Sequence, residues 1–217
     1  MKLVWSPETA SKAYIETVKS CGLLKQSSVA ELVSAMAAGW DAKLIVETWS
    51  RGGAISTSIG LAIARNHTKG RHVCVVPDED SKSEYEGSMA RSGHSAEIIV
   101  GEPEEAMEGL QGVDFLVVDS SVKGFARILR VARLGHRGAV LMCKNASSRV
   151  ASDFRWRGVL DRESRIVRSV FLPVGQGLDM AHVGAKVEGP PRRNGESRWI
   201  KHVDRKSGEE FVFRKLA

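Results

Sequence analysis

A carboxylate followed by two glycines gives the clearest chemical signal in the sequence. Residues 43–47 form a short apolar run that ends in Glu47, which is typical of a buried parallel strand. Gly52 and Gly53 then favour a turn, and from Ile55 the apolar residues recur at helical spacing. Such a turn directs free backbone N–H groups and the positive end of a helix dipole at the end of the strand. The pattern predicts a binding site for a nucleotide or dinucleotide-like cofactor.

Two roles are open to the polar side chains near this turn. Ser56 and Thr57 begin the helix behind the glycines, so they can bind an anion or cap the helix N-terminus. Glu47 and Asp119 each end an apolar strand, so both lie at one edge of a parallel sheet. There they can hold a ligand or cap a turn.

The elements that position these residues alternate along the chain. Residues 113–119 give the strongest buried-strand signal and are expected in the middle of the sheet. Ser28 and Glu31 form a capping box for the second helix. Alternation of this kind predicts a parallel sheet with helices on both faces. Helices are expected at residues 6–20, 29–38, 55–65, 81–91, 103–110 and 125–134, and strands at 43–47, 71–76, 96–100, 113–119 and 139–143.

The last part of the chain breaks this alternation. Residues 166–172 and 178–187 flank the turn sequence Pro-Val-Gly-Gln-Gly and indicate a hairpin, so the sheet becomes mixed and seven-stranded. We therefore expect one α/β domain at residues 1–187, with its N-terminal helices within residues 6–38. Residues 189–191, Gly-Pro-Pro, are typical of a linker. The basic extension at 188–217 can form a small hairpin from residues 199–203 and 211–213.

The composition is ordinary for a soluble globular protein, with 42% hydrophobic and 27% charged residues among 217. No apolar run approaches the roughly 18 residues that a membrane span needs. Pro7 and Glu8 interrupt any signal-peptide core, so we expect a protein of the cytoplasm or the nucleus without a membrane partner. Cys21, Cys74 and Cys143 lack metal-ligand spacing and are expected to be buried free thiols.

Charge is unevenly distributed along the chain. Residues 1–121 carry 11 Lys and Arg against 17 Asp and Glu, whereas residues 122–168 carry 12 against 3. The tail, residues 186–217, carries 9 against 5. This asymmetry favours a nucleic acid or another polyanion as partner, and a solvated face that balances the acidic half is the alternative. The basic residues expected on the outer face of the helix at 125–134 are Lys123, Arg127, Arg130 and Arg133.

The order of elements resembles the class I S-adenosylmethionine (SAM) methyltransferases, and within them the caffeoyl-CoA and catechol O-methyltransferase group. The likeness covers residues 28–187 and rests on IVETWSRGGAISTSIGLA, FLVVDSSVKGF, GAVLMCKN and LPVGQGLDMAHV, which stand in that group's order and spacing. The resemblance implies a three-layer Rossmann-like methyltransferase fold with SAM as cofactor. The whole chain also resembles a plant family defined only as a domain of unknown function with this fold, which implies no activity.

Several positions depart from the group at the implied cofactor site. Glu47 and Gly53 match its first motif, but Trp49 stands where its first glycine lets the cofactor approach the backbone. The ribose-binding acid of the group falls on Pro77, and Asp78, one residue later, faces the other side of the strand. These departures imply weak or absent SAM binding. The candidate contacts are Glu47, Trp49, Gly52, Gly53, Ser56, Asp78, Gly101 and Asp119.

The implied metal site departs further. The group binds a divalent ion through an Asp after its fourth strand and an Asp-Asn pair after its fifth. Asp119 and Asn145 match, but Lys144 replaces the middle ligand. An ammonium ~4 Å from a divalent cation costs about 8 kcal/mol at an effective dielectric of roughly 20, so no metal is expected. Instead, we predict that the Lys144 ammonium replaces the ion beside Asp119, with a solvent-facing lysine as the alternative. The group's catalytic lysine falls on Val122, which leaves the catalytic residues undefined.

Three functions remain open at this stage. The first is a protein that keeps the methyltransferase fold, has lost metal-dependent O-methylation, and binds an unidentified small molecule or partner. The second is an active, metal-independent methyltransferase acting on a small molecule. The third is a nucleic-acid or polyanion binder that uses the basic half. Departures at both the cofactor and the metal positions favour the first.

Overall fold

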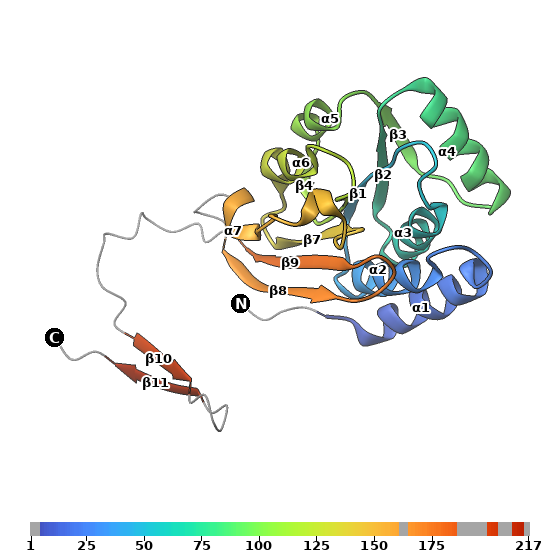
Figure 1. Ribbon diagram of the computed structural model, residues 1–217. Helices are drawn as coiled ribbons and strands as arrows, with labels where there is room; N and C mark the ends of the chain where they lie inside the picture. Colours follow the sequence, from blue (N-terminus) through green and yellow to red (C-terminus); the bar gives the residue numbers. More distant parts are fainter. Residues whose placement is uncertain (1–4, 161–164, 186–198, 204–209, 215–217) are drawn as a thin grey trace. The chain divides into compact units, whose positions relative to one another are not determined.

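The computed structural model of the protein describes residues 5–160, 165–185, 199–203 and 210–214 (Figure 1). The chain divides into two units, residues 1–186 and 187–217. The first unit is a three-layer α/β fold in which helices cover both faces of one sheet (Figure 1). This is the architecture that the alternating strands and helices predict.

The sheet of the first unit is made of β1 (Leu44–Thr48), β2 (Arg71–Val76), β3 (Glu97–Val100), β5 (Phe115–Asp119), β7 (Gly138–Lys144), β8 (Ile166–Leu172) and β9 (Leu178–Gly184). Its order is β3-β2-β1-β5-β7-β9-β8. The five strands from β3 to β7 run parallel, and β9 runs antiparallel to both β7 and β8. The predicted seven-stranded mixed sheet is thus confirmed, with β5 central and the hairpin at one edge.

Each face of the sheet has its own hydrophobic core and its own helices. The helices are α1 (Pro7–Cys21), α2 (Ser27–Gly39), α3 (Ile55–Thr68), α4 (Glu79–Arg91), α5 (Pro103–Gly109), α6 (Phe125–Val131) and α7 (Trp156–Val159), with a 3-10 turn at Arg149–Ala151. α2, α3 and α4 cover one face, and α1 packs on α2 and α3. α5, α6 and α7 cover the other face. Within the described ranges, every helix is too short or too polar to cross a membrane.

The first two helices differ in how their N-termini are capped. Ser6 caps α1 by accepting a hydrogen bond from the backbone N–H of Thr9 at 3.4 Å. The capping box expected at Ser28 and Glu31 is wrong. α2 begins two residues earlier, at Ser27 behind Gln26, whose backbone is left-handed with φ of 60°, and no side chain caps it.

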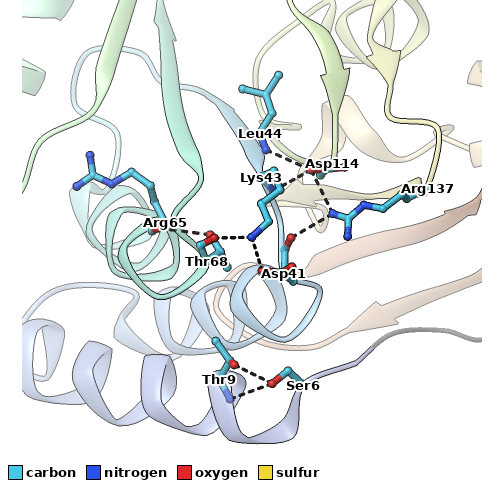
Figure 2. Close-up of polar contacts among 9 residues, drawn as sticks. All are labelled: Ser6, Thr9, Asp41, Lys43, Leu44, Arg65, Thr68, Asp114 and Arg137. Carbon is cyan, nitrogen blue, oxygen red and sulfur yellow. Dashed lines mark hydrogen bonds and ion pairs between the residues drawn. The ribbon is translucent and has the colours of Figure 1, made fainter.

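Asp114 fixes the start of β1 at the N-terminal edge of the sheet (Figure 2). Its carboxylate accepts hydrogen bonds from the backbone N–H groups of Lys43 at 2.8 Å and Leu44 at 3.2 Å. The guanidinium of Arg137 lies 3.6 Å from the same carboxylate. Lys43 also donates through Nζ to the carbonyl oxygen of Thr68 at 2.6 Å. This network holds the edge opposite to the carboxyl ends of the strands.

α7 was not predicted, and the strand and the helix expected within residues 113–134 differ from the structure. The strand expected at residues 113–119 is split at Asp114 into β4 (Gln111–Val113) and β5. The helix expected at residues 125–134 ends at Val131, because Ala132 takes an extended backbone and β6 (Arg133–Leu134) pairs with β4. The basic face expected on that helix is exposed, but Arg133 belongs to β6.

The three cysteines are buried and free, as predicted. Burial raises the pKa of the Cys21 thiol to about 11 and also raises the thiol pKa values of Cys74 and Cys143. At neutral pH these thiols are protonated and act as small apolar side chains.

The second unit contains one antiparallel pair, β10 (Trp199–Val203) and β11 (Glu210–Arg214). Trp199 is the register partner of Arg214, and Val203 is the partner of Glu210. The expected linker at residues 189–191 lies outside the described residues.

Candidate cofactor and metal site

The sheet changes direction between β1 and β5, and the candidate residues gather at the carboxyl ends of these strands. From β1 the chain proceeds outward through β2 and β3, and then returns to β5 and β7 on the other side. Glu47 lies within β1 and Asp119 ends β5. In open α/β sheets this position is where a crevice for a ligand forms.

Glu47 is fully buried, and both of its carboxylate oxygens accept hydrogen bonds from other side chains. Oε1 lies 2.9 Å from the hydroxyl of Tyr85 and 3.0 Å from Nε2 of His72. Oε2 accepts from the hydroxyl of Ser58 at 3.0 Å. Because an ionised carboxylate only accepts, Nε2 of His72 carries the proton. The partners come from α4, β2 and α3, so Glu47 joins three elements beneath the sheet edge.

The Glu47 carboxyl remains ionised in this environment. Burial by itself raises the pKa of Glu47, but the hydrogen bond and charge of His72, the charge of Lys144 and the Ser58 hydroxyl outweigh it. The net pKa is lower than the ordinary value for Glu. Glu47 therefore acts as a buried anion held by donors from three neighbouring elements.

Trp49 lies in the hydrophobic core, with 3% of its surface exposed. Its ring makes an edge contact with Tyr85, with ring centroids 5.4 Å apart. A Cβ atom placed on Gly53 would lie 2.9 Å from Nε1 of Trp49, so the glycine makes room for the indole. Trp49, which stands where the O-methyltransferase group has its first glycine, is thus packed between the turn and α4.

The glycine turn is closed by acidic side chains of α4. The backbone N–H of Gly52, where φ is 75°, donates to Glu84 at 3.1 Å. Arg51 lies 3.4 Å from Glu84 and 3.5 Å from Asp80. Ser56 has 1% of its surface exposed and donates to the carbonyl oxygen of Lys25 at 2.8 Å. No side chain caps α3, so the capping role considered for Ser56 is wrong.

Asp78 and Gly101 follow β2 and β3 at the same edge of the sheet. Asp78 is the N-cap of α4 and accepts from the backbone N–H of Ser81 at 2.7 Å. This bond lowers the pKa of the exposed Asp78 carboxyl. Gly101 has a φ of 145° and donates its N–H to the carbonyl oxygen of Val76. Asp78 thus has a helix-capping role in the fold.

Asp119 is held by a ring of donors at the end of β5. Nδ2 of Asn145 lies 3.0 and 2.9 Å from its two carboxylate oxygens, and the Ser121 backbone N–H donates at 2.9 Å. Nζ of Lys144 lies 3.9 Å from Oδ2 of Asp119, and the Lys144 side chain is 3% exposed. Burial raises the pKa of Asp119, but the hydroxyl of Ser121, Asn145 and the Lys144 charge lower it further than burial raises it.

The Lys144 ammonium does not fit a divalent cation beside Asp119. Hard cations need several oxygen ligands, and here a positive charge lies 3.9 Å from the Asp119 carboxylate. Across the described ranges, no three His, Cys, Asp or Glu side chains form a group that could hold a metal ion.

Sequence reasoning missed the side chains that surround Glu47. Glu47 pairs in register with Cys74, and His72 lies two residues away along β2 on the same face. A histidine near the start of an otherwise apolar strand is the available signal for His72. The sequence gives no signal for the contacts of Ser58 and Tyr85 with Glu47, because these contacts depend on how α3 and α4 pack on the sheet.

The fold is shared by solved methyltransferase structures. A methyltransferase from Geobacter sulfurreducens matches with a TM-score of 0.58 and 21% identity, over 82% of this chain and 90% of its own. TomG from Streptomyces achromogenes, an O-methyltransferase of tomaymycin synthesis solved with SAM, matches with a TM-score of 0.54 and 22% identity, over 84% and 92%. A proposed caffeoyl-CoA O-methyltransferase from Staphylococcus aureus matches with a TM-score of 0.55 and 15% identity, over 80% and 91%. The chain therefore has the class I methyltransferase fold.

The chain belongs to the family described as "Protein of unknown function (DUF1442)", whose model matches residues 1–215. No curated protein matches the chain.

Proposed function

We propose that this chain is a methyltransferase-fold protein that does not carry out metal-dependent O-methylation and instead binds a ligand or a partner. One observation carries the proposal. The ammonium of Lys144 is buried 3.9 Å from Asp119, at the position where the resemblance to the O-methyltransferases places a metal ligand.

A single ammonium replaces the electrostatic role of a cation but not its chemistry. Lys144 supplies one positive charge to Asp119 and to Glu47, whose pKa values it helps to lower. It offers no open coordination position, so it cannot bind and polarise two oxygens of a substrate as a divalent ion does. This supports the loss of metal-dependent catalysis.

Weak or absent SAM binding is part of the proposal. Glu47 has 0% of its surface exposed, and its oxygens are occupied by protein donors. Trp49 fills the space behind the glycine turn. A cofactor that contacts either side chain would have to displace these internal contacts, which opposes binding.

A second candidate is metal-independent methyl transfer. The observation that favours it is the pair of glycine turns at the carboxyl edge, where Gly52 and Gly101 have φ values of 75° and 145°. A Cβ atom added at either glycine would have nothing within 4 Å, so both turns present bare backbone to open space.

Manganese binding tests the loss of the metal site. Free Mn²⁺ is measured by electron paramagnetic resonance during titration of the natural chain and of Lys144→Asp. The proposal predicts no binding by the natural chain at millimolar Mn²⁺, and binding by Lys144→Asp, which restores a carboxylate between Asp119 and Asn145. Binding by the natural chain, or none by Lys144→Asp, contradicts the proposal. Lys123→Asp, on the exposed segment before α6, is the matched control.

A further inference from the structure

β8 is the outermost strand of the sheet (Figure 1). A groove of about 1030 Å³ lies beside it. Every residue from 166 to 171 lines it, together with the segment at 154–157 beside the strand. Asp179 of β9 also lines the groove, so the groove lies over the β8–β9 pair beside α7 and extends to the outer strand of the sheet.

The open edge of β8 has little of the usual protection. Within the described ranges, β8 pairs with β9 alone, so the backbone groups of its other edge are free to pair with another chain. The strand is seven residues long. Val167 is 52% exposed and Phe171 is 51% exposed, and such apolar exposure on an edge strand is usually avoided.

The groove carries positive charge. Arg155, Arg157 and Arg168 line it and are exposed. The one described acid in the lining is Asp179, whose Oδ1 accepts from Nε1 of Trp156 at 2.8 Å. An occupant with carboxylates is complementary to this lining.

The positive charge of the groove also argues against two other occupants, the tail of this chain and a second copy of the chain. The tail, residues 186–217, carries 9 Lys and Arg against 5 Asp and Glu, so its net charge has the same sign as that of the three arginines. A second copy paired edge to edge would bring a second set of the three arginines. An acidic segment of another protein would bring opposite charge to the three arginines.

We propose that the β8 edge binds an extended acidic peptide of a partner protein, which adds to the sheet as a further strand. Backbone hydrogen bonds to β8 hold the peptide, Val167 and Phe171 contact its apolar side chains, and the three arginines pair with its carboxylates. This refines the polyanion expected from the basic half and places it away from the basic face of α6. The site is independent of the cofactor edge, so it stands whether or not that edge is catalytic.

Fluorescence anisotropy with a labelled dodecapeptide of alternating Glu and Val tests the proposal on the full chain. Binding is compared with an alternating Lys-Val peptide, with the Glu-Val peptide N-methylated along its length, and with a fifteen-nucleotide oligouridylate. The groove variant is Arg155→Glu/Arg157→Glu/Arg168→Glu. The control variant is Lys123→Glu/Arg127→Glu/Arg130→Glu, which changes the net charge equally on another exposed surface.

The Glu-Val peptide is expected to bind, to lose roughly tenfold or more in affinity with the groove variant, and to change less than about twofold with the control. The Lys-Val and N-methylated peptides are expected not to bind, because one lacks carboxylates and the other lacks backbone donors. Failure of the Glu-Val peptide to bind, equal effects of the two variants, or tighter binding of oligouridylate overturns the proposal. The last outcome would assign the basic half to nucleic acid.

Discussion

The Lys144 ammonium lies 3.9 Å from Oδ2 of Asp119, and the two residues are register partners at the carboxyl ends of β7 and β5. Because Lys144 is almost fully buried, its charge is balanced by protein groups and not by water. The contact therefore joins two neighbouring strands at the edge where the fold offers a ligand site.

Replacement of Lys144 by Met should destabilise the fold. It leaves the Asp119 carboxylate without its cation and removes positive charge near Glu47. The expected loss is about 3 kcal/mol, the lower range for breaking a buried ion pair, because Asp119 keeps 15% of its side chain exposed. Urea unfolding measures the change, with Lys123→Met as an exposed control. Equal stability of Lys144→Met and the natural chain would show that the pair contributes little.

Glu47→Gln should also lower stability, by about 2 kcal/mol. The amide keeps the shape of Glu47 but loses the charge that accepts from His72, Tyr85 and Ser58. Glu108→Gln, on the exposed side of α5, should change the unfolding free energy by less than about 0.5 kcal/mol. A Glu47→Gln variant as stable as the natural chain would contradict a structural role for the network.

The Asp119 carboxylate should contribute a pH-dependent part of the stability. Its pKa is lower in the folded chain than its ordinary value, so its contribution is present above the unfolded pKa of ~4 and is lost as pH falls through the folded value. The difference in unfolding free energy between the natural chain and Asp119→Asn should be largest near neutral pH and shrink below about pH 4. Unfolding curves across this range measure it. If this difference in unfolding free energy increased as the pH is lowered, the prediction would be wrong.

Trp49→Gly should lower the stability of the fold and strengthen SAM binding. Removal of the buried indole leaves a cavity against Tyr85 and should cost about 3–5 kcal/mol. The same change restores the glycine of the methyltransferase motif, so SAM should bind more tightly than to the natural chain. Calorimetry measures the affinity, and urea unfolding verifies that the variant is folded. Unchanged SAM affinity in a folded variant would show that Trp49 is not the obstacle.

Periodicity was sufficient to predict the seven strands of the main sheet in order, and the signal is clearest for β1, β5 and β7, which are buried on both faces and read as apolar runs. Asp114 shows where this fails. Its neighbours continue the apolar run, but its carboxylate bonds to the start of β1, and this contact is defined only after the sheet has formed.

The candidate site was predictable in part. Asp119, Lys144 and Asn145 follow neighbouring strands, so their proximity could be inferred from the order of the sheet. The partners of Glu47 could not, because the contact with His72 depends on the register of β1 against β2 and the contact with Tyr85 depends on how α4 packs.

The most direct test of the account is calorimetric titration of the natural full chain with SAM and with its demethylated product, each with and without Mg²⁺. The closed contacts of Glu47 and Trp49, and the ammonium of Lys144 beside Asp119, predict dissociation constants weaker than about 1 mM and no effect of Mg²⁺. Low-micromolar binding of either compound would contradict the predicted loss of SAM binding, and binding that strengthens with Mg²⁺ would contradict the predicted loss of the metal site.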